Sequence, residues 1–481
     1  MGRLFFLSAL SIISVTSLAR PWIGVASAYM VAILTPQAVW SWDFGDLRPA
    51  LWILVPTCIG TVIALLRGKL SLSRLRSSRA LFLVTLWLCF VLSYLAGPYT
   101  DVTGPFRFTD ASAALSLLNK MFMLCLLACF IIDDTRKLWA LSWVLASSGA
   151  YLVYWANDQY LSGHVFGRLA GPVDLDGVGA YADENTFAML FVVLQPFLWH
   201  LGYAVKQRWL RWGLWLIIPF AWHAVFLTAS RGGLIGIVVA VLVMALRSKR
   251  RALGILLLPA FLIAYQWQAG IIMKERAETI DQYATETSAS TRIEAWRAAV
   301  GMIAAHPVTG VGLASFGVAF PDFSDRKPRE AHNTFFQIAA ESGVLAGLMF
   351  LLLGFGSVFA LWRNGNQLKK ADPAVRDEKL YLINEAVLSG MCGFLACAMF
   401  LSLQLSEIFY FLCALVHIVL LISRKRSAAS GTLSADGAGR PAPPRLGRAI
   451  QVTLTFEGGS GNTGGGGGGA PPAESDPTLN T

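Results

Sequence analysis

Residues 227–246 read LTASRGGLIGIVVAVLVMAL, in which a single charged residue, Arg231, separates one apolar segment from the next. Apolar runs of this kind suit a membrane, because about 20 helical residues cross a hydrocarbon core of about 30 Å. The 481 residues of the whole chain are 55% hydrophobic and only 14% charged. A soluble domain is about one quarter charged. We therefore predict an all-α polytopic membrane protein.

Thirteen apolar stretches are candidate membrane spans, and because several of them are short, twelve spans fit the sequence equally well. The stretches are residues 4–18, 22–40, 48–66, 80–97, 113–132, 138–155, 186–204, 213–229, 232–246, 252–272, 336–361, 383–401 and 407–423.

Basic residues indicate the orientation of these spans, because Lys and Arg in short loops are retained on the cytoplasmic side. Four basic clusters agree on one face, and they lie at residues 67–79, 206–211, 247–251 and 424–426. The long loops 156–185 and 273–335 and the turn at Arg231 are then predicted on the other, periplasmic face. The net charge of +10 is explained by this topology and by contact with anionic lipid, so no nucleic-acid partner is predicted.

The chain divides into three parts by composition. Residues 1–185 form an N-terminal transmembrane region with the loop 156–185, and residues 186–423 form a second transmembrane region that includes the loop 273–335. Residues 424–481 are rich in Ala, Ser, Gly and Pro. Because such a composition buries too little apolar surface to fold, we predict a disordered cytoplasmic tail.

The stretch AHNTFFQIAAESGVLAG, residues 331–347, places a His-Asn pair directly before an apolar helix. An imidazole accepts and releases a proton near neutral pH, so His332 is the candidate base. Asn333, Gln337 and Glu341 follow at steps of four and form a polar stripe, which favours a wet groove that binds substrate. The GxxxG spacing of Gly343 and Gly347 is typical of close helix packing, which is compatible with that groove.

Arginines are the candidate anion ligands. Arg231 is either an interfacial anchor or a functional group; its predicted place on the periplasmic face and the small neighbours at 232–233 favour function. Residues 291–303 have helical spacing and are predicted to lie along the membrane surface. Arg292 and Arg297 on this helix point in different directions. Each is either a solvated charge or a ligand, and Arg297 can pair with Glu294.

Two further loops carry candidate ligand-binding residues. His306 opens HPVTGVGLASF, residues 306–316, whose single proline and two glycines indicate a turn. This turn can present backbone N–H groups to a ligand, or His306 can simply bond a carbonyl. The loop 156–185 contains Arg168 and an acidic cluster, in which Asp183 can cap a helix or bind an acceptor hydroxyl or a cation; the cluster is Asp174, Asp176, Asp183 and Glu184.

No metal site is predicted, because the other histidines are scattered and none of them has metal-ligand spacing. All seven cysteines fall in predicted spans, so no disulfide framework is implied. We therefore expect neither a metal nor another cofactor.

The Arg-Gly turn at 231–232, the loop helix with Arg292, HPVTGVGLASF and the pattern HN-x9-G from His332 together resemble the O-antigen ligase and O-antigen polymerase superfamily. The resemblance covers residues 186–422 and is most specific over 226–347. GPVDLDGVGAYADENTFAM, residues 171–189, is also similar to the O-glycosylation ligases that accompany exosortase systems. Ala346 departs from the Gly, Thr or Tyr that the ligase pattern favours there.

The resemblance implies a GT-C-like transferase of the bacterial inner membrane, with an active site that faces the periplasm. Its expected partners are an undecaprenyl-diphosphate-linked glycan donor, a glycan, lipid or protein acceptor, and membrane lipids. By position, Arg231 and Arg292 match the arginines that hold the diphosphate, and His332 matches the histidine beside the acceptor hydroxyl. The expected transfer is inverting and metal-independent.

Two kinds of alternative remain open at this point. Within the enzyme class, the acceptor is a second lipid-linked glycan for a polymerase, or a protein Ser or Thr for a protein O-glycosylation ligase. Outside it, the chain is a flippase or exporter of lipid-linked glycan. A flippase is expected to distribute charges along the spans, whereas the candidates here gather at one membrane face, which favours a transferase.

Overall fold

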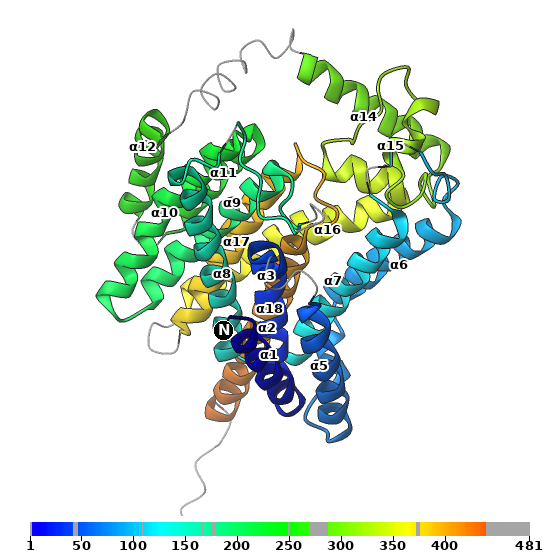
Figure 1. Cartoon of the computed structure of the whole chain (residues 1–481). Coiled ribbons are helices and arrows are strands. Elements are labelled where there is room, and N and C mark those ends of the chain that lie inside the picture. The colour runs from blue at the N-terminus through cyan, green and yellow to red at the C-terminus, as the bar shows by residue number, and fades with distance from the viewer. Residues whose placement is uncertain are drawn as a thin grey trace, which may run out of the picture. The chain divides into compact units, whose positions relative to one another are not determined.

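The structure is a computed structural model that describes residues 2–41, 47–104, 106–107, 109–165, 167–174, 179–248, 251–268, 287–371 and 376–438 (Figure 1). Within these ranges every regular element is a helix. The elements are α1 (Gly2–Ala19), α2 (Pro21–Leu34), α3 (Pro36–Val39), α5 (Pro49–Leu66), η1 (Leu72–Leu75), α6 (Ser78–Ala96), α7 (Ala111–Ile131), α8 (Thr135–Leu161), α9 (Glu184–Ala204), α10 (Arg208–Thr228), α11 (Arg231–Arg247), α12 (Arg251–Gln268), α14 (Thr287–Ala305), α15 (Phe316–Ala319), η2 (Phe320–Asp322), α16 (Thr334–Lys370), α17 (Glu378–Ala398) and α18 (Glu407–Ala438).

Each of the thirteen predicted stretches centres on one of these helices, and the prediction of an all-α polytopic membrane protein is confirmed. Nine helices in the described ranges are long and apolar enough to cross a membrane. This number is below the predicted twelve or thirteen. Two further apolar helices, Arg3–Ala19 and Gly254–Gln268, are shorter than a span.

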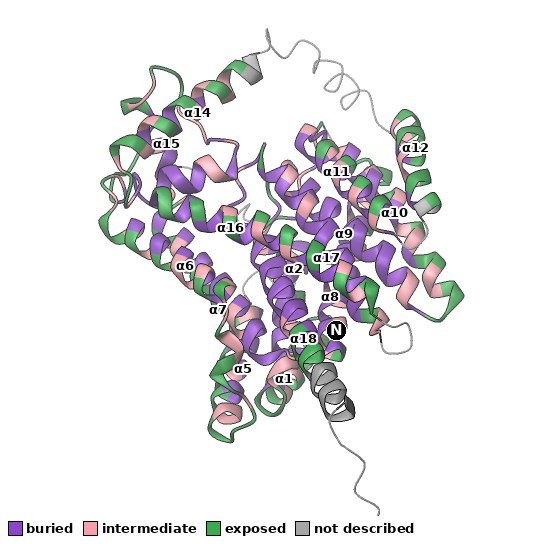
Figure 2. Cartoon of the chain, turned by 180° about the vertical axis from the view of Figure 1, so that it is seen from behind, coloured by how far each residue is buried: buried purple, intermediate pink, exposed green. Residues whose placement is uncertain are grey.

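The helices α9 and α17 form the centre of the transmembrane region. They pack against each other and against α11, and α9 also contacts α10. In the most apolar part of each of these two helices, 89% of the residues are buried. Both helices are largely purple in Figure 2. In contrast, α6 exposes Leu81, Leu88 and Leu95. Exposed apolar side chains of this kind are expected where a span faces lipid.

Ion pairs with Asp133 bring two of the basic clusters together at one end of this helical region. Asp133, just before α8, contacts Arg74 (2.7 Å) and Lys425 (3.6 Å), which belong to the clusters 67–79 and 424–426. Arg426 pairs with Asp377 just before α17. We call this end, with Arg247 at the last residue of α11, the basic end. The predicted shared face of these clusters agrees with the contacts.

The helix α16 is broken where the sequence predicts a continuous span. Gly343 has non-helical backbone angles (φ 87°, ψ 166°). The loop after α14 occupies the break, because Val344 N–H donates to Pro307 O and Gly312 N–H donates to Glu341 O. A Cβ at position 343 would lie 2.2 Å from Val308 O. Prediction of a regular helix is therefore wrong at this residue, and Gly343 admits a close backbone neighbour.

Candidate functional site

The start of α11 is fixed by a clamp that centres on Arg168. Its guanidinium donates to Thr228 O (3.0 Å) and to Asn185 Oδ1 (3.1 Å), and it lies 3.4 Å from a carboxylate oxygen of Glu184. Ser230 Oγ donates to the same Asn185 oxygen (2.8 Å) and accepts from the N–H of residue 233. Arg168 therefore ties the turn before Arg231 to the beginning of α9.

The segment 399–403 joins the start of α11 to the start of α16. Phe400 Cβ lies 3.4 Å from where a Cβ of Gly232 would stand. On the other side, Asn333 Nδ2 donates to Met399 O (3.1 Å), and Thr334 Oγ1 donates to Leu401 O (2.7 Å). The same segment therefore contacts the residues next to Arg231 and next to His332, and we call this end of the region the site end.

His332 occupies a turn between α14 and α16. Its backbone is left-handed (φ 48°), a conformation that is uncommon outside glycine and that concentrates at functional sites. On one side, Trp296 Nε1 donates to Ala331 O (3.0 Å). On the other, Ala331 N–H donates to Gln337 Oε1 (2.8 Å). Arg292 lies one turn before Trp296 on the same face of α14.

Several charged side chains affect the pKa of His332. Burial lowers the pKa of its imidazole below the usual value, and the positive charges of Arg292 and Arg329 lower this pKa further, while Asp183 raises it. A lowered pKa keeps the imidazole neutral at pH 7, which is the form that accepts a proton. The structure therefore brings His332 and Arg292 together as predicted, with Asp183 in the same neighbourhood.

Glu330 is a functional candidate that the sequence reasoning missed. Burial raises the pKa of its carboxyl; a hydrogen bond with Ser402 lowers it, and the negative charge of Asp183 raises it. The charge of Asp183 therefore acts on both Glu330 and His332. The position of Glu330 two residues before His332 is the only signal in the sequence, and a charged residue in a polar loop gives no indication that it is buried.

The polar stripe after His332 is buried and satisfied within the protein. Asn333 caps α16, since its Oδ1 accepts from Phe336 N–H (3.2 Å). Gln337 Nε2 donates to Glu341 Oε1 (2.7 Å). The side chains of Asn333, Gln337 and Glu341 are at most 3% exposed. Through the hydrogen bond between Ala331 and Gln337, the stripe holds the turn that carries His332. Substrate contact by Asn333, Gln337 and Glu341 remains a prediction.

Two predicted ligands lie apart from this cluster. Arg297 is 75% exposed and forms the expected contact with Glu294, at 3.7 Å. His306 follows Arg292 by 14 residues on or just after α14, a helical distance of about 21 Å, and its ring packs edge-on against Tyr99. In the turn 306–316, the backbone N–H groups of Val311 and Gly312 donate to carbonyl oxygens of α16. Asp176 of the predicted acidic cluster lies outside the described residues.

Comparison with known proteins agrees with the resemblance. Residues 213–351 match the family model described as O-Antigen ligase, a range that contains Arg231, Arg292 and His332. No curated protein that was compared matches the chain. The described helices therefore indicate a multi-pass membrane protein, and its residues 213–351 are similar to the O-antigen ligase domain, which supports the resemblance to the O-antigen ligase and polymerase superfamily.

Proposed function

We propose that this protein transfers a glycan from undecaprenyl diphosphate to an acceptor hydroxyl at the periplasmic face of the bacterial inner membrane. The family match supports membrane glycan processing in general. The donor, the reaction and the face of the membrane are our proposal.

The proposed orientation rests on the two ends of the helical region. Arg231 and Arg247 stand at opposite ends of α11, so the site end and the basic end are separated by the length of that helix. Basic clusters are retained in the cytoplasm, which assigns the periplasm to the site end. The helix α18 begins next to the site end and passes through the cluster 424–426, so the tail that follows is assigned to the cytoplasm.

Arg231 and Arg292 are the proposed ligands of the donor diphosphate. A guanidinium offers two parallel N–H groups to a phosphate and stays protonated at all relevant pH values. When the bond between sugar and diphosphate breaks, negative charge develops on the leaving oxygen, and fixed positive groups stabilise that charge. These arginines can supply the stabilisation without a metal ion.

His332 is the proposed general base, and its place in a left-handed turn between α14 and α16, within reach of the charges of Arg292 and Asp183, is the observation that carries the proposal. The acceptor hydroxyl oxygen attacks the anomeric carbon, and its proton passes to the imidazole. The carbon–oxygen bond to the diphosphate breaks, and the electron pair leaves with the diphosphate. A single displacement of this kind inverts the anomeric configuration.

The principal test is transfer in liposomes that contain purified protein, lipid-linked glycan and the acceptor fraction of the source cells. For His332→Ala we expect transfer to fall by about 10²- to 10⁴-fold, the usual contribution of a general base, with donor binding retained. His164→Ala is the matched control, because His164 is exposed in the loop 156–185 on the same face. Transfer by His332→Ala at the wild-type rate would remove this residue from the mechanism.

Chelation tests the metal-independent scheme. We expect the transfer rate to be unchanged after EDTA treatment and dialysis, because the scheme uses only arginines and a histidine. Loss of transfer that one divalent metal restores would contradict it.

The acceptor decides between a ligase and a polymerase. Mass spectrometry of glycoconjugates from a deletion strain distinguishes them, because a missing lipid or protein conjugate indicates a ligase, and shortened glycan chains indicate a polymerase. Movement of lipid-linked glycan across the bilayer without covalent transfer would instead indicate a flippase.

A further inference from the structure

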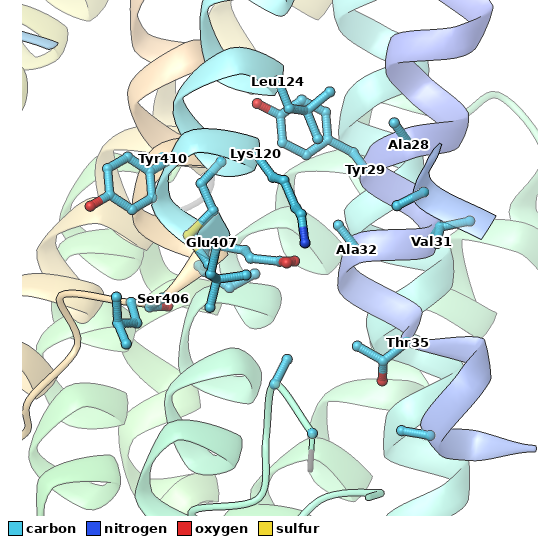
Figure 3. Close-up of a pocket in the computed structure, with 18 of the residues that line it drawn as sticks. Ala28, Tyr29, Val31, Ala32, Thr35, Lys120, Leu124, Ser406, Glu407 and Tyr410 are labelled. Carbon is cyan, nitrogen blue, oxygen red and sulfur yellow. The ribbon is translucent and has the colours of Figure 1, made fainter. Parts of the chain in front are cut away.

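A cavity lies at the start of α18. It has a volume of about 330 Å³ and is enclosed by α2, α5, α7 and α18, together with residues 179–181 (Figure 3). This volume is at the lower end of the range for small-molecule sites, about 300–1,000 Å³. Neither the two proposed diphosphate ligands nor His332 lines it.

The walls of this cavity are mostly apolar. Ala28 and Ala32 from α2 lie across from Leu124 of α7 (Figure 3), and Ile408 from α18 also lines the cavity. Ligand sites commonly combine such walls with a few placed polar groups that fix the orientation of the ligand.

Four polar side-chain atoms of the lining residues have no hydrogen-bond partner in the described structure. They are Tyr29 OH, Thr35 Oγ1, Gln37 Oε1 and Glu407 Oε2. Tyr29 is only 2% exposed and Thr35 only 5%. Because a buried polar atom without a partner is unfavourable and rare, four of them around one cavity indicate a ligand with several hydrogen-bonding groups.

A pair of opposite charges narrows the chemical class of that ligand. In Figure 3, the Lys120 ammonium from α7 and the Glu407 carboxylate point toward each other across the cavity. Asp174 also lines the cavity, so the two acidic side chains outnumber the single ammonium of Lys120 and disfavour a phosphate. A hydrocarbon tail would leave the polar atoms unsatisfied. A sugar ring fits both conditions, because its hydroxyls donate to the carboxylate and the amide oxygen and accept from the ammonium.

The cavity is connected to the site end through one continuous segment. Residues 399–403 contact the start of α16, and Leu405, Ser406 and Glu407 line the cavity. Tyr181 also lines the cavity, and it stands two residues before Asp183, whose charge acts on His332. A glycan whose reacting end lies at His332 therefore has a neighbouring place for another of its sugar units.

We propose that this cavity is a sugar subsite, in which Tyr29, Thr35, Gln37, Lys120 and Glu407 bind the hydroxyls of one sugar unit of a glycan substrate. The proposal rests on the proposed function for the identity of the glycan. The sugar belongs either to the donor glycan or to the acceptor, since both present the same hydroxyl chemistry.

Saturation-transfer NMR on the full-length protein in detergent tests this subsite directly. The probes are mono- and disaccharides released by mild acid hydrolysis from two fractions of the source cells, the lipid-linked glycans and the acceptor glycoconjugates. We expect signals from one fraction, which identifies the source of the sugar. A wild-type protein that gives no signal with either fraction would overturn the proposal.

Variants connect the signal to the cavity. Ala32→Phe fills the space and should abolish binding, whereas Tyr29→Phe and Thr35→Val should each weaken binding by about three- to tenfold, the effect of one hydrogen bond. Neither hydroxyl bonds within the described protein, so thermal unfolding of these two variants should be unchanged or later. Thr61→Val is the matched control, because Thr61 Oγ1 is buried but donates to Thr57 O on α5. Equal binding by all of these variants would overturn the subsite.

This measurement is independent of the transfer reaction. His332→Ala should retain sugar binding while it loses transfer. Sugar binding by a wild-type protein that shows no transfer would support the subsite and refute the proposed function. Transfer by a wild-type protein that binds no sugar would support the proposed function and refute the subsite.

Discussion

Two arginines near opposite ends of the helical region have contrasting surroundings. Arg247, at the basic end, donates to both carboxylate oxygens of Glu385 (2.6 and 2.9 Å) and to Asn366 Oδ1 (2.7 Å). Glu385 is fully buried. Arg292, beside the site, forms no hydrogen bond or ion pair with any described residue and acts on His332 through its charge.

The difference separates a structural arginine from the arginine that we propose as a ligand of the diphosphate. The donors of Arg247 are occupied by a buried partner, so this side chain joins α11 to α17 and to α16. Arg292 has no such partner among the described residues, which fits its proposed role as a ligand of the diphosphate. Sequence alone does not distinguish these two arginines, because both stand close to the end of a predicted helix.

The largest expected effect is on the stability of the basic end. Arg247→Leu leaves the buried Glu385 carboxylate without its partner, so we expect the free energy of unfolding to fall by about 3–5 kcal/mol. Thermal unfolding in detergent, followed by intrinsic fluorescence, measures this change. Unfolding at the wild-type temperature would show that the pair does not hold the helices together.

Arg292→Leu is the matched variant at the site end. We expect its unfolding temperature to equal that of the wild type, while transfer falls by about 10²- to 10³-fold, as for loss of one group that stabilises a developing anion. The comparison fails if Arg292→Leu unfolds early and transfers normally when folded.

A smaller effect tests how the site end is held, which depends on close backbone contacts. Gly343→Ala places a Cβ 2.2 Å from Val308 O at a positive φ, and we expect a loss of about 1–3 kcal/mol. Gly356→Ala in the same helix meets nothing within 4 Å, so it should be neutral or stabilising by about 0.5–1 kcal/mol. Equal unfolding temperatures for the two variants would show that the break in α16 tolerates a side chain.

Much of this arrangement could be predicted from the sequence. The apolar runs predict a helix at each of the thirteen stretches, and the structure confirms these helices. This inference succeeds because hydropathy is a local property of the chain. The basic clusters predict one membrane face for Arg231, Arg292 and His332, and this placement stays a prediction. Nine of the described helices have the length and composition of a span, which is fewer than the twelve or thirteen predicted stretches, and the 17-residue α11 is just below that length.

The remaining features depend on contacts between distant segments. Asp183 precedes α9 and Glu330 precedes α16, and no pattern in either loop indicates that the charge of Asp183 acts on both Glu330 and His332. The stripe of Asn333, Gln337 and Glu341 was predicted from its helical spacing, but its burial depends on the segment 399–403. The break at Gly343 depends likewise on the loop after α14, which lies outside the helix that it interrupts.

The pH dependence of transfer tests most directly whether His332 is the base between these charges. Burial and Arg292 lower its pKa below the usual 6.5, so the rate should fall only when pH drops through that lowered value and the imidazole becomes protonated. Arg292→Gln removes a positive charge, raises the pKa of His332 and should move the fall to higher pH. Asp183→Asn removes a negative charge and should move it to lower pH. Opposite shifts are the predicted result, and an unmoved profile in both variants, or shifts in the same direction, would contradict the account.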